Sequence, residues 1–429
     1  MKKNIKISII VGTRPEIIKI APVIKECKKN HLNFFILHTN QHYSKNLDKI
    51  FFKELELPAP KYNLKIKSGT HAEEVGKMLI GIERVLIKEK PDIFLVLADT
   101  NTALAGALAA AKLHIRIYHI EAGLRSYSRE MPEEINRILT DHCSDLFFAP
   151  TEKSKQILIN EGISKNKIFI TGNTIVDAVY QNLKLSEKKS KILKKLNIKK
   201  EKYFLLTMHR PENVDKKEKI KEIFEGLRLI YKKFNLPIIF PIHPRTQKMM
   251  DNFKLKTPEG IKTIEPVGYL DFLKLEAGAR LILTDSGGIQ EEACILKTPC
   301  ITLRSNTERP ETIEVGSNIL AGTNSSKILK IVYKMLDKKR NWKNPFGDGK
   351  SAEKIIRIIL KTSMSQSQYL KMLEKEIQRI NKKIDLKILQ GQNYKKEAME
   401  HKLLLKKVRY HSRSNFFRKF FPTFAQFSF

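Results

Sequence analysis

Residues 284–292 read Thr-Asp-Ser-Gly-Gly-Ile-Gln-Glu-Glu and directly follow the largely apolar run 279–283. A strand that ends in small residues and opens a helix points free backbone N–H groups beyond the edge of a sheet. Those groups and the helix dipole favour a phosphate. Ser286, Gly287 and Gly288 would let a diphosphate approach the backbone closely, because glycine has no Cβ. A capped turn without a ligand fits the same residues, so both interpretations stay open here.

The strand and helix pattern around this stretch recurs along the chain. Short apolar runs alternate with helical patterns, which is typical of parallel α/β sheets. The first half predicts strands at 5–11, 34–38, 93–97, 116–120, 146–149 and 168–171, and the second half at 203–207, 238–242, 262–264, 279–283 and 299–303. The predicted fold is therefore α/β, with two Rossmann-like domains whose strand ends face each other across a cleft. Ligands bind at such strand ends.

Changes in composition divide the chain. A lysine-rich polar stretch at 184–202 interrupts the pattern, so we expect one domain at 1–183 and a nucleotide-binding domain at 184–350. Beyond residue 363 the chain becomes a basic extension, 364–429, which we expect to be helical and partly disordered. Its apolar residues recur at helical spacing and stop near Gly391: Leu370, Leu373, Ile377, Ile380 and Ile384.

The net charge of +34 suggests a nucleic-acid partner, but the distribution of the charge along the chain does not. Only the extension concentrates it, with 15 Lys/Arg against 5 Asp/Glu. The rest of the chain mixes signs and lacks basic residues interleaved with aromatic ones, so we expect no nucleic-acid partner. The extension, with Phe416 and Phe417 near its end, suggests instead a contact with a membrane surface or a partner protein.

Other compositional features point to a cytoplasmic protein. No apolar stretch reaches the roughly 18 residues of a membrane span, and the N-terminal apolar run is too short for a signal peptide. The four cysteines form no CxxC pair, as expected in a reducing compartment. The histidines lack metal-ligand spacing, and no GxGxxG or Walker A motif occurs, so we expect neither a metal nor a redox cofactor.

Polar residues cluster after the predicted strands of both halves. Each has a purely structural alternative, such as a helix cap or a buried, satisfied histidine. Their shared place at strand ends favours acid–base chemistry on a nucleotide-linked substrate. The set includes Arg14, Lys19, Gln41, His42, Asp99, Glu121, Glu133, Arg137, His209 and His243.

Eight ordered motifs carry a resemblance to a known family. They begin with Gly-Thr-Arg-Pro-Glu at 12–16 and Ala-Asp-Thr at 98–100, and end with the Asp-Ser-Gly-Gly turn at 285–288 and Thr-Glu-Arg-Pro-Glu at 307–311. Between these lie 121–125, 132–137, 172–174 and 209–210. Over about residues 4–362 the chain resembles the non-hydrolysing UDP-N-acetylglucosamine 2-epimerases. The resemblance implies a glycosyltransferase B type fold, a homodimer without metal or cofactor, and a last helix near 351–362 that crosses back to the first domain.

The family's reaction explains why these residue types occur. The C2 proton of the sugar is not acidic enough to be removed directly. The resemblance implies that UDP leaves C1 as the proton leaves C2, forming an enzyme-bound glycal to which UDP adds again. Arg14, His209 and the Ser286–Gly288 amides suit the developing diphosphate charge. Asp99, Glu121 and Glu133 match the family's three acids, without an assignment of the base.

Further roles follow only from the resemblance. Lys19, Arg309 and Glu292 would contact the substrate or the uridine ribose, Phe272 would lie near the base, and Arg137 would hold the catalytic carboxylates. Gln41, His42 and His243 match a regulatory UDP-sugar site of bacterial relatives. Two departures from the family pattern are Ala98, where glycine is usual, and Val267, where some relatives have a polar residue.

The sequence leaves alternatives to an epimerase that makes UDP-N-acetylmannosamine for a surface polysaccharide. In one alternative the chemistry is the same but the substrate is another UDP-sugar, such as a UDP-diacetamido uronic acid. A hydrolysing relative is disfavoured by the intact 12–16 motif. A glycosyltransferase of the same fold would not explain three acids in the cleft. A non-enzymatic basic binding protein is the remaining alternative, which salt-sensitive nucleic-acid binding by the chain without residues 364–429 would support.

Overall fold

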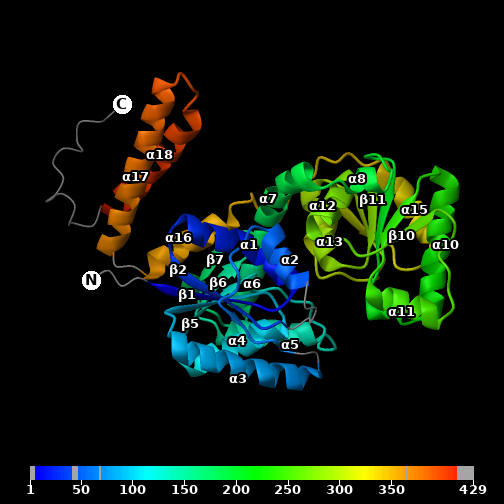
Figure 1. The fold of residues 1–429 in the computed structure, drawn as a ribbon, viewed down its shortest axis with the longest axis horizontal. Coiled ribbons are helices and arrows are strands. Elements are labelled where there is room, and N and C mark those ends of the chain that lie inside the picture. The colour runs from blue at the N-terminus through cyan, green and yellow to red at the C-terminus, as the bar shows by residue number, and fades with distance from the viewer. Residues whose placement is uncertain (1–4, 41–46, 67–68, 364–365, 413–429) are drawn as a thin grey trace. The chain divides into compact units, whose positions relative to one another are not determined.

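The computed structural model describes residues 5–40, 47–66, 69–363 and 366–412. Two all-parallel sheets form the centre of the compact unit Met1–Ile355, and residues Ile356–Phe429 form a second unit. Figure 1 shows the two sheets with their flanking helices. The predicted α/β class with two Rossmann-like sheets is confirmed.

The first sheet has seven strands in the order β3-β2-β1-β4-β5-β6-β7. The order reverses beside β1, which creates the topological switch point where ligands bind in such sheets. The bounds are β1 Lys6–Val11, β2 Asn33–His38, β3 Tyr62–Asn63, β4 Ile93–Leu97, β5 Arg116–Ile120, β6 Leu146–Ala149 and β7 Ile168–Ile170. The two-residue β3 was not predicted, because it is too short to show a period-two pattern.

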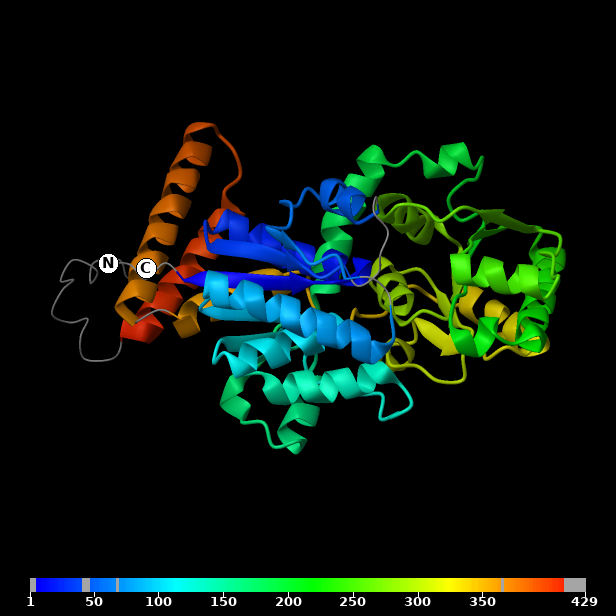
Figure 2. The ribbon, with the colours of Figure 1, turned by 60° about the horizontal axis from the view of Figure 1, so that its bottom comes forward.

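Helices cover both faces of this sheet (Figure 2). Helix α1 packs against α7 and α3 against α4. Alanines fill the inner side of α4, which lets it lie close to the strands. The helices are α1 Arg14–Lys29, α2 Leu47–Glu54, α3 His71–Glu89, α4 Asn101–Lys112, α5 Pro132–Cys143, α6 Glu152–Asn160 and α7 Thr174–Lys189, with a 3-10 turn at Lys165–Lys167.

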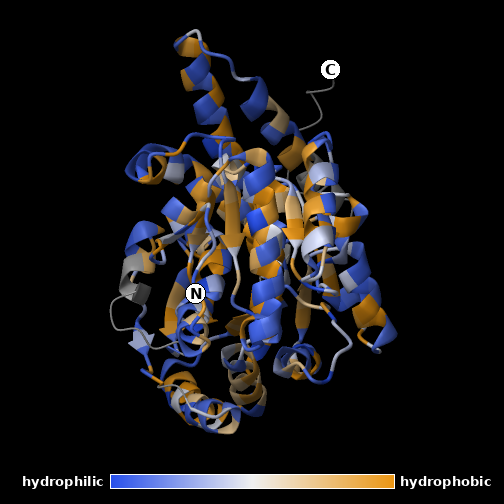
Figure 3. Ribbon diagram, turned by 90° about the vertical axis from the view of Figure 1, so that its right-hand side faces the viewer, coloured by the Kyte–Doolittle hydropathy of each residue, from blue (hydrophilic) through white to orange (hydrophobic). Residues whose placement is uncertain are grey.

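The second sheet has six strands in the order β10-β9-β8-β11-β12-β13. Its interior is rich in Ile, Leu and Phe, and Figure 3 shows hydrophobic residues along the strands. The strands are β8 Phe204–Thr207, β9 Ile238–Pro241, β10 Ile261–Ile264, β11 Leu281–Thr284, β12 Cys300–Thr302 and β13 Asn318–Leu320. The helices are α8 Ile192–Lys195, α9 Pro211–Val214, α10 Lys217–Phe234, α11 Pro244–Asn252, α12 Tyr269–Gly278, α13 Gly287–Leu296, α14 Pro310–Glu314 and α15 Ser325–Leu336.

The segment between the sheets is more regular than its composition predicted. Helix α7 continues to Lys189, into the lysine-rich stretch 184–202 where the composition predicts that the pattern stops. Its lysines lie on the solvent side, while Asn182 and Ser186 are buried and the Ser186 hydroxyl donates to the Leu270 carbonyl at 2.6 Å. The many lysines on the exposed side of α7 therefore concealed, in the sequence, that the other side is buried.

The end of the chain is helical in the part that the structure describes. Helix α16 spans Ser351–Ser363, and its first backbone amides, at Ser351 and Ala352, donate to the carboxylate of Asp177 at 3.0 Å. Helices α17 Gln366–Leu389 and α18 Lys395–Ser412 pack against each other, joined by a turn at Gly391, which has a φ of +63°. Among the described residues, no helix has the length and apolarity to cross a bilayer.

Candidate active site

A cavity of about 350 Å³ lies at the carboxyl ends of the first sheet and is also lined by two residues of the second. Asp99 reaches it after β4 and Glu133 from the start of α5, and His209 and Arg210 follow strand β8 of the second sheet. The remaining lining residues are Thr13, Pro15, Glu16, Lys19, His71, Leu97, Ala98, Thr100, Asn101, Pro132 and Asn136. Acidic groups of one half thus share a space with basic groups of the other.

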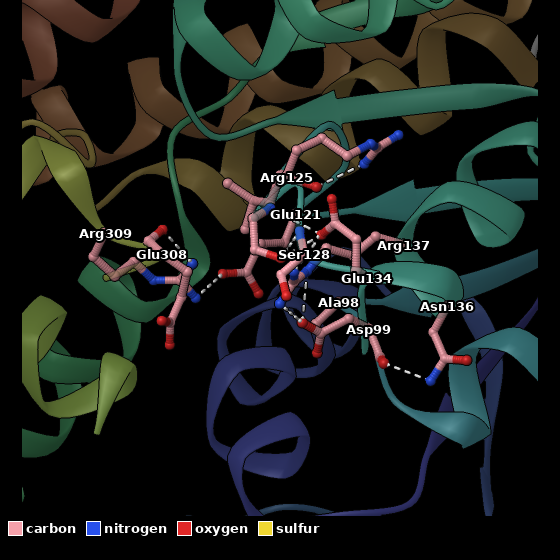
Figure 4. A network of polar contacts seen from close by, with 12 residues as sticks. Ala98, Asp99, Glu121, Arg125, Ser128, Glu134, Asn136, Arg137, Glu308 and Arg309 are labelled. Carbon is pink, nitrogen blue, oxygen red and sulfur yellow. Dashed lines mark hydrogen bonds and ion pairs between the residues drawn. The ribbon is translucent and has the colours of Figure 1, made fainter. Parts of the chain in front are cut away.

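Asp99 follows β4 and is held by Arg137 of helix α5 (Figure 4). The guanidinium donates to Asp99 Oδ2 from Nε at 2.9 Å and from Nη2 at 2.6 Å, while Nη1 donates to Glu134 at 2.7 Å. Burial opposes ionisation of Glu134, but amides at Ser126 and Tyr127 together with Arg137 hold its pKa below the usual range. Glu134 therefore stays charged and fixes the arginine that orients Asp99.

Glu121 lies at the centre of a buried ion-pair network rather than on the cavity wall. Lys19 donates to both its oxygens at 2.7 and 2.8 Å, and Arg309 lies 3.6 Å away. Arg309 also pairs with Glu291 at 3.0 Å, and the Asn173 amide donates to both carboxylates. Burial alone would raise the pKa of Glu121, but Lys19 and Arg309 hold it below the usual range.

Glu16 closes the turn that follows β1. One of its oxygens accepts from the backbone amides of Gly12 and Thr13 and from the Thr13 hydroxyl, and the other accepts from the Thr100 hydroxyl at 2.6 Å. Burial nevertheless raises the pKa of Glu16 to about 7. This carboxyl therefore changes charge near neutral pH beside the cavity.

His209 is fixed from the second sheet by Asp285. The buried Asp285 carboxylate accepts from the backbone amides of His209 and Arg210 and lies 3.2 Å from His209 Nδ1. Burial alone would raise the pKa of Asp285, but His209 and the backbone amides hold it below its usual range. The His243 ring lies 5.4 Å from that of His209, centroid to centroid. A fixed anion thus orients one imidazole at the cavity.

Helix α13 begins at Gly287, with Ser286 as its N-cap. Gly287 is covered by the side chain of Glu308, because a Cβ there would meet Glu308 Oε1 at 2.2 Å. Gly288 is open, since a Cβ would have only the Ser286 hydroxyl nearby, at 4.0 Å. Burial alone would raise the pKa of Glu308, but nearby arginines, beginning with Arg309, lower it to about 2. The start of α13 therefore offers an exposed glycine amide next to several arginines.

Glu292 lies one turn further along α13. It accepts a hydrogen bond from the Tyr269 hydroxyl at 2.9 Å, and burial raises its pKa to about 7. Glu276, which is fully buried, lies against it, and its own pKa is raised well above the usual range by burial and by Glu292. Phe272 packs on a hydrophobic cluster that includes Leu275 and Ala293.

A family model described as UDP-N-acetylglucosamine 2-epimerase matches residues 25–360. The chain belongs to this family. The UDP-N-acetylglucosamine 2-epimerase of Methanocaldococcus jannaschii is 62% identical over 360 residues, which cover 82% of this chain and 98% of the relative. A UDP-2,3-diacetamido-2,3-dideoxy-D-glucuronate 2-epimerase of Pseudomonas aeruginosa is 40% identical over 361 residues, 83% of this chain and 99% of the relative.

A crystal structure supports the same assignment. That of the M. jannaschii UDP-GlcNAc 2-epimerase, in complex with UDP-GlcNAc and UDP, superposes with a TM-score of 0.78 at 62% identity and covers 83% of this chain and 100% of that one. The resemblance to the epimerase family and the glycosyltransferase B type fold that it implied are both confirmed.

Within this member of the epimerase family, the predicted site residues lie in several distinct places. Asp99, Glu133, Lys19 and His209 line the cavity. Behind it, in ion pairs or at the start of α13, lie Glu121, Arg137, Arg309, Ser286, Gly287, Gly288 and Glu292. Arg14 lies over the Phe51 ring, with its guanidinium carbon 5.6 Å from the ring centroid. Gln41 and His42 lie outside the described residues, and His243 is exposed at the N-cap of α11.

Four further residues at this site received no role from the sequence: Glu16 and Glu134, which were noted only as polar residues near strand ends, and Asn173 and Glu291. All four lie within the quoted motifs, which was the available signal. Asn173, for example, donates to Glu121, 52 residues before it, and to Glu291, 118 residues after it, and no local pattern indicates either contact.

Proposed function

We propose that this chain is a UDP-N-acetylglucosamine 2-epimerase that interconverts UDP-GlcNAc and UDP-ManNAc. The shared cavity carries the proposal, because it combines Asp99 and Glu133 with His209 and Arg210. Epimerisation by elimination needs proton-transferring acids on one side and cations for a departing diphosphate on the other. The epimerases at 62% and 59% identity support UDP-GlcNAc as the substrate.

The proposed reaction proceeds in two balanced halves. A carboxylate removes the C2 proton while the C1–O bond breaks, so that UDP leaves with the bonding electrons and a C1–C2 double bond forms. UDP then attacks C1 again, and a carboxylic acid delivers a proton to the opposite face of C2. Arg210 and His209, with the α13 amides, stabilise the diphosphate charge.

The carboxylates differ in what surrounds them, which supports separate roles. Asp99 and Glu133 line the cavity. Glu121 lies behind the cavity wall, where its charge is neutralised by Lys19 and Arg309. We propose that Asp99 and Glu133 exchange protons with C2. In this proposal Glu121 holds Lys19 and Arg309 in place for the substrate, and Glu292 binds the uridine ribose beside Phe272.

Solvent exchange at C2 tests the proposal. The protein is incubated with UDP-GlcNAc in D2O, and C2 is followed by NMR. We expect deuterium at C2 together with a UDP-ManNAc signal, and loss of both in Asp99→Asn. Asp251→Asn, a substitution on the exposed side of α11, is the matched control and keeps the wild-type rate. Exchange only with a UDP-2,3-diacetamido uronic acid would identify that sugar nucleotide as the substrate in place of UDP-GlcNAc. No exchange with either would refute the epimerase function.

We also propose the assembly and cellular context that accompany this activity. A homodimer is expected, which light scattering would detect as twice the chain mass of 49.7 kDa. The buried thiols of Cys27, Cys294 and Cys300 support a reducing, cytoplasmic location. UDP-ManNAc would supply a surface polysaccharide. His243, with Gln41 and His42, is the proposed regulatory position.

The division of labour along the chain is part of the proposal. Residues 1–183 with the helix at 351–362 would provide the acid–base groups, and residues 184–350 would bind the nucleotide. The extension 364–429 would contact an anionic membrane surface. Its described helices expose Leu389, Met399 and Leu403 to 84%, 69% and 51%, in a segment with a net charge of +10.

A further inference from the structure

His119 lies in strand β5, with a side chain that is 1% exposed. Its Nδ1 atom is 2.7 Å from Asp141 Oδ1, and its Nε2 atom is 2.9 Å from the carbonyl oxygen of Ala98. A carboxylate and a carbonyl both accept hydrogen bonds. A neutral imidazole has one N–H and would turn a lone pair toward one of them, whereas an imidazolium donates to both.

The carboxylate that faces the ring is itself buried and paired with an arginine. Asp141 is fully buried, accepts from the Gly123 amide at 3.2 Å, and pairs with Arg125 at 2.8 Å, which also pairs with Glu161. Burial opposes ionisation of Asp141, but His119 and Arg125 hold its pKa below the usual range. Asp141 thus lies between the imidazole of His119 and the guanidinium of Arg125, and the neighbours of His119 in β4 and β6, Val96 and Phe147, are uncharged.

The carbonyl that His119 holds belongs to an unusual peptide. Ala98 has a φ of +62°, in the left-handed region that residues with a Cβ rarely adopt. Its own amide donates to the Ile120 carbonyl at 3.0 Å, and the carbonyl of the next residue, Asp99, accepts from Asn136 at 2.9 Å. Hydrogen bonds on both sides thus hold a conformation that alanine alone disfavours.

We infer that His119 is a positioning residue: a buried imidazolium, anchored by Asp141, that locks the left-handed Ala98 peptide and so aims Asp99 into the cavity. This inference rests on the proposed function only for the role of Asp99. Without the lock, Ala98 relaxes to a negative φ, and the peptide that leads to Asp99 turns. Arg137 alone then holds the carboxylate from its far end.

A double-mutant cycle tests the lock. His119→Phe keeps a ring but donates nothing, and we expect the rate of C2 exchange to fall by about tenfold to a hundredfold, as for a small misplacement of a reacting group. The dissociation constant for UDP changes by less than about twofold, because the loss affects orientation and not uniform binding. Thr298→Val, which removes a buried hydroxyl bond to the Glu276 carbonyl in the second sheet domain, controls for lost stability.

Glycine at position 98 distinguishes a lock from a merely structural ion pair. Glycine adopts a positive φ as readily as a negative one, so in an Ala98→Gly background His119→Phe should slow exchange by less than about threefold. Equal losses in both backgrounds would overturn the inference. His119→Gln should retain more exchange than His119→Phe, because its amide donates to the Ala98 carbonyl.

A spectroscopic test is independent of activity. In the full chain labelled with 15N-histidine, His119 should show two ring N–H signals in slow exchange with water, which disappear in His119→Gln. Failure of wild-type C2 exchange would count against the proposed function and leave these signals unaffected. A single ring N–H would overturn the imidazolium assignment even if exchange is observed.

Discussion

Glu16 illustrates at the scale of one residue how the site combines hydrogen bonds with desolvation. It accepts bonds from two backbone amides and two hydroxyls, which favour the charged form. Burial outweighs them, and the pKa rises to about 7. The carboxyl therefore holds its proton more tightly in the folded protein than in the unfolded chain, where its pKa is ordinary.

That difference predicts a pH dependence of stability. Between pH 4.5 and about 7 the folded state binds more protons than the unfolded state, so the contribution of Glu16 to stability falls as the pH rises. Relative to Glu16→Gln, the wild type should lose up to about 3 kcal/mol of unfolding free energy between pH 5 and pH 8. Urea unfolding at both pH values measures this. The titration of Glu292 occurs in both proteins and cancels when their unfolding free energies are subtracted. Parallel changes of unfolding free energy with pH in the two proteins would contradict the prediction.

At the scale of an element, the start of helix α13 contains two glycines with different surroundings. Gly287 lies under Glu308, whereas Gly288 has open space around its Cα. A methyl group at 287 would displace a side chain that pairs with Arg304 at 2.9 Å. A methyl group at 288 would meet no protein atom closer than 4.0 Å, but would occupy the approach of a diphosphate to the helix amides.

Alanine at these two positions should therefore have opposite effects on stability. Gly288→Ala should raise the unfolding free energy by up to about 1 kcal/mol, since alanine favours a helix. It should also weaken UDP binding by at least about tenfold. Gly287→Ala should lower stability. Thermal unfolding and calorimetric titration with UDP measure both quantities, and unchanged UDP affinity in Gly288→Ala would place the diphosphate elsewhere.

The elements also show how far the sequence alone could go. The turn at 285–288 and the apolar strands were predictable, because small residues and apolar runs act locally. Strand β13 was missed, since three residues carry no period. The distinction between Glu121 and Glu133 was not predictable either. Both are acids in the segment after β5, Glu121 directly after the strand and Glu133 in the first turn of α5, and only the tertiary contact of Glu121 with Lys19, 102 residues away, removes it from the cavity wall.

At the scale of the whole molecule, the fold and the extension differ in what they contribute. The M. jannaschii epimerase matches over 98% of its length, yet the match covers only 82% of this chain. The cavity, the ion-pair network and helix α13 all lie before residue 312. The extension carries +10 of the +34 net charge. Catalysis and surface binding should therefore be separable.

Deletion of residues 364–429 provides the test. The shortened chain has a net charge of +24 and should retain C2 exchange with kcat and KM within about twofold of the full chain, because no group placed at the cavity is lost. The full chain should sediment with vesicles that contain anionic lipid, but not with zwitterionic ones. Because the attraction is between opposite charges, added salt should weaken it. The shortened chain should stay in solution with both. Equal sedimentation of the two chains would show that the basic surface of the remaining protein, and not the extension, binds the membrane.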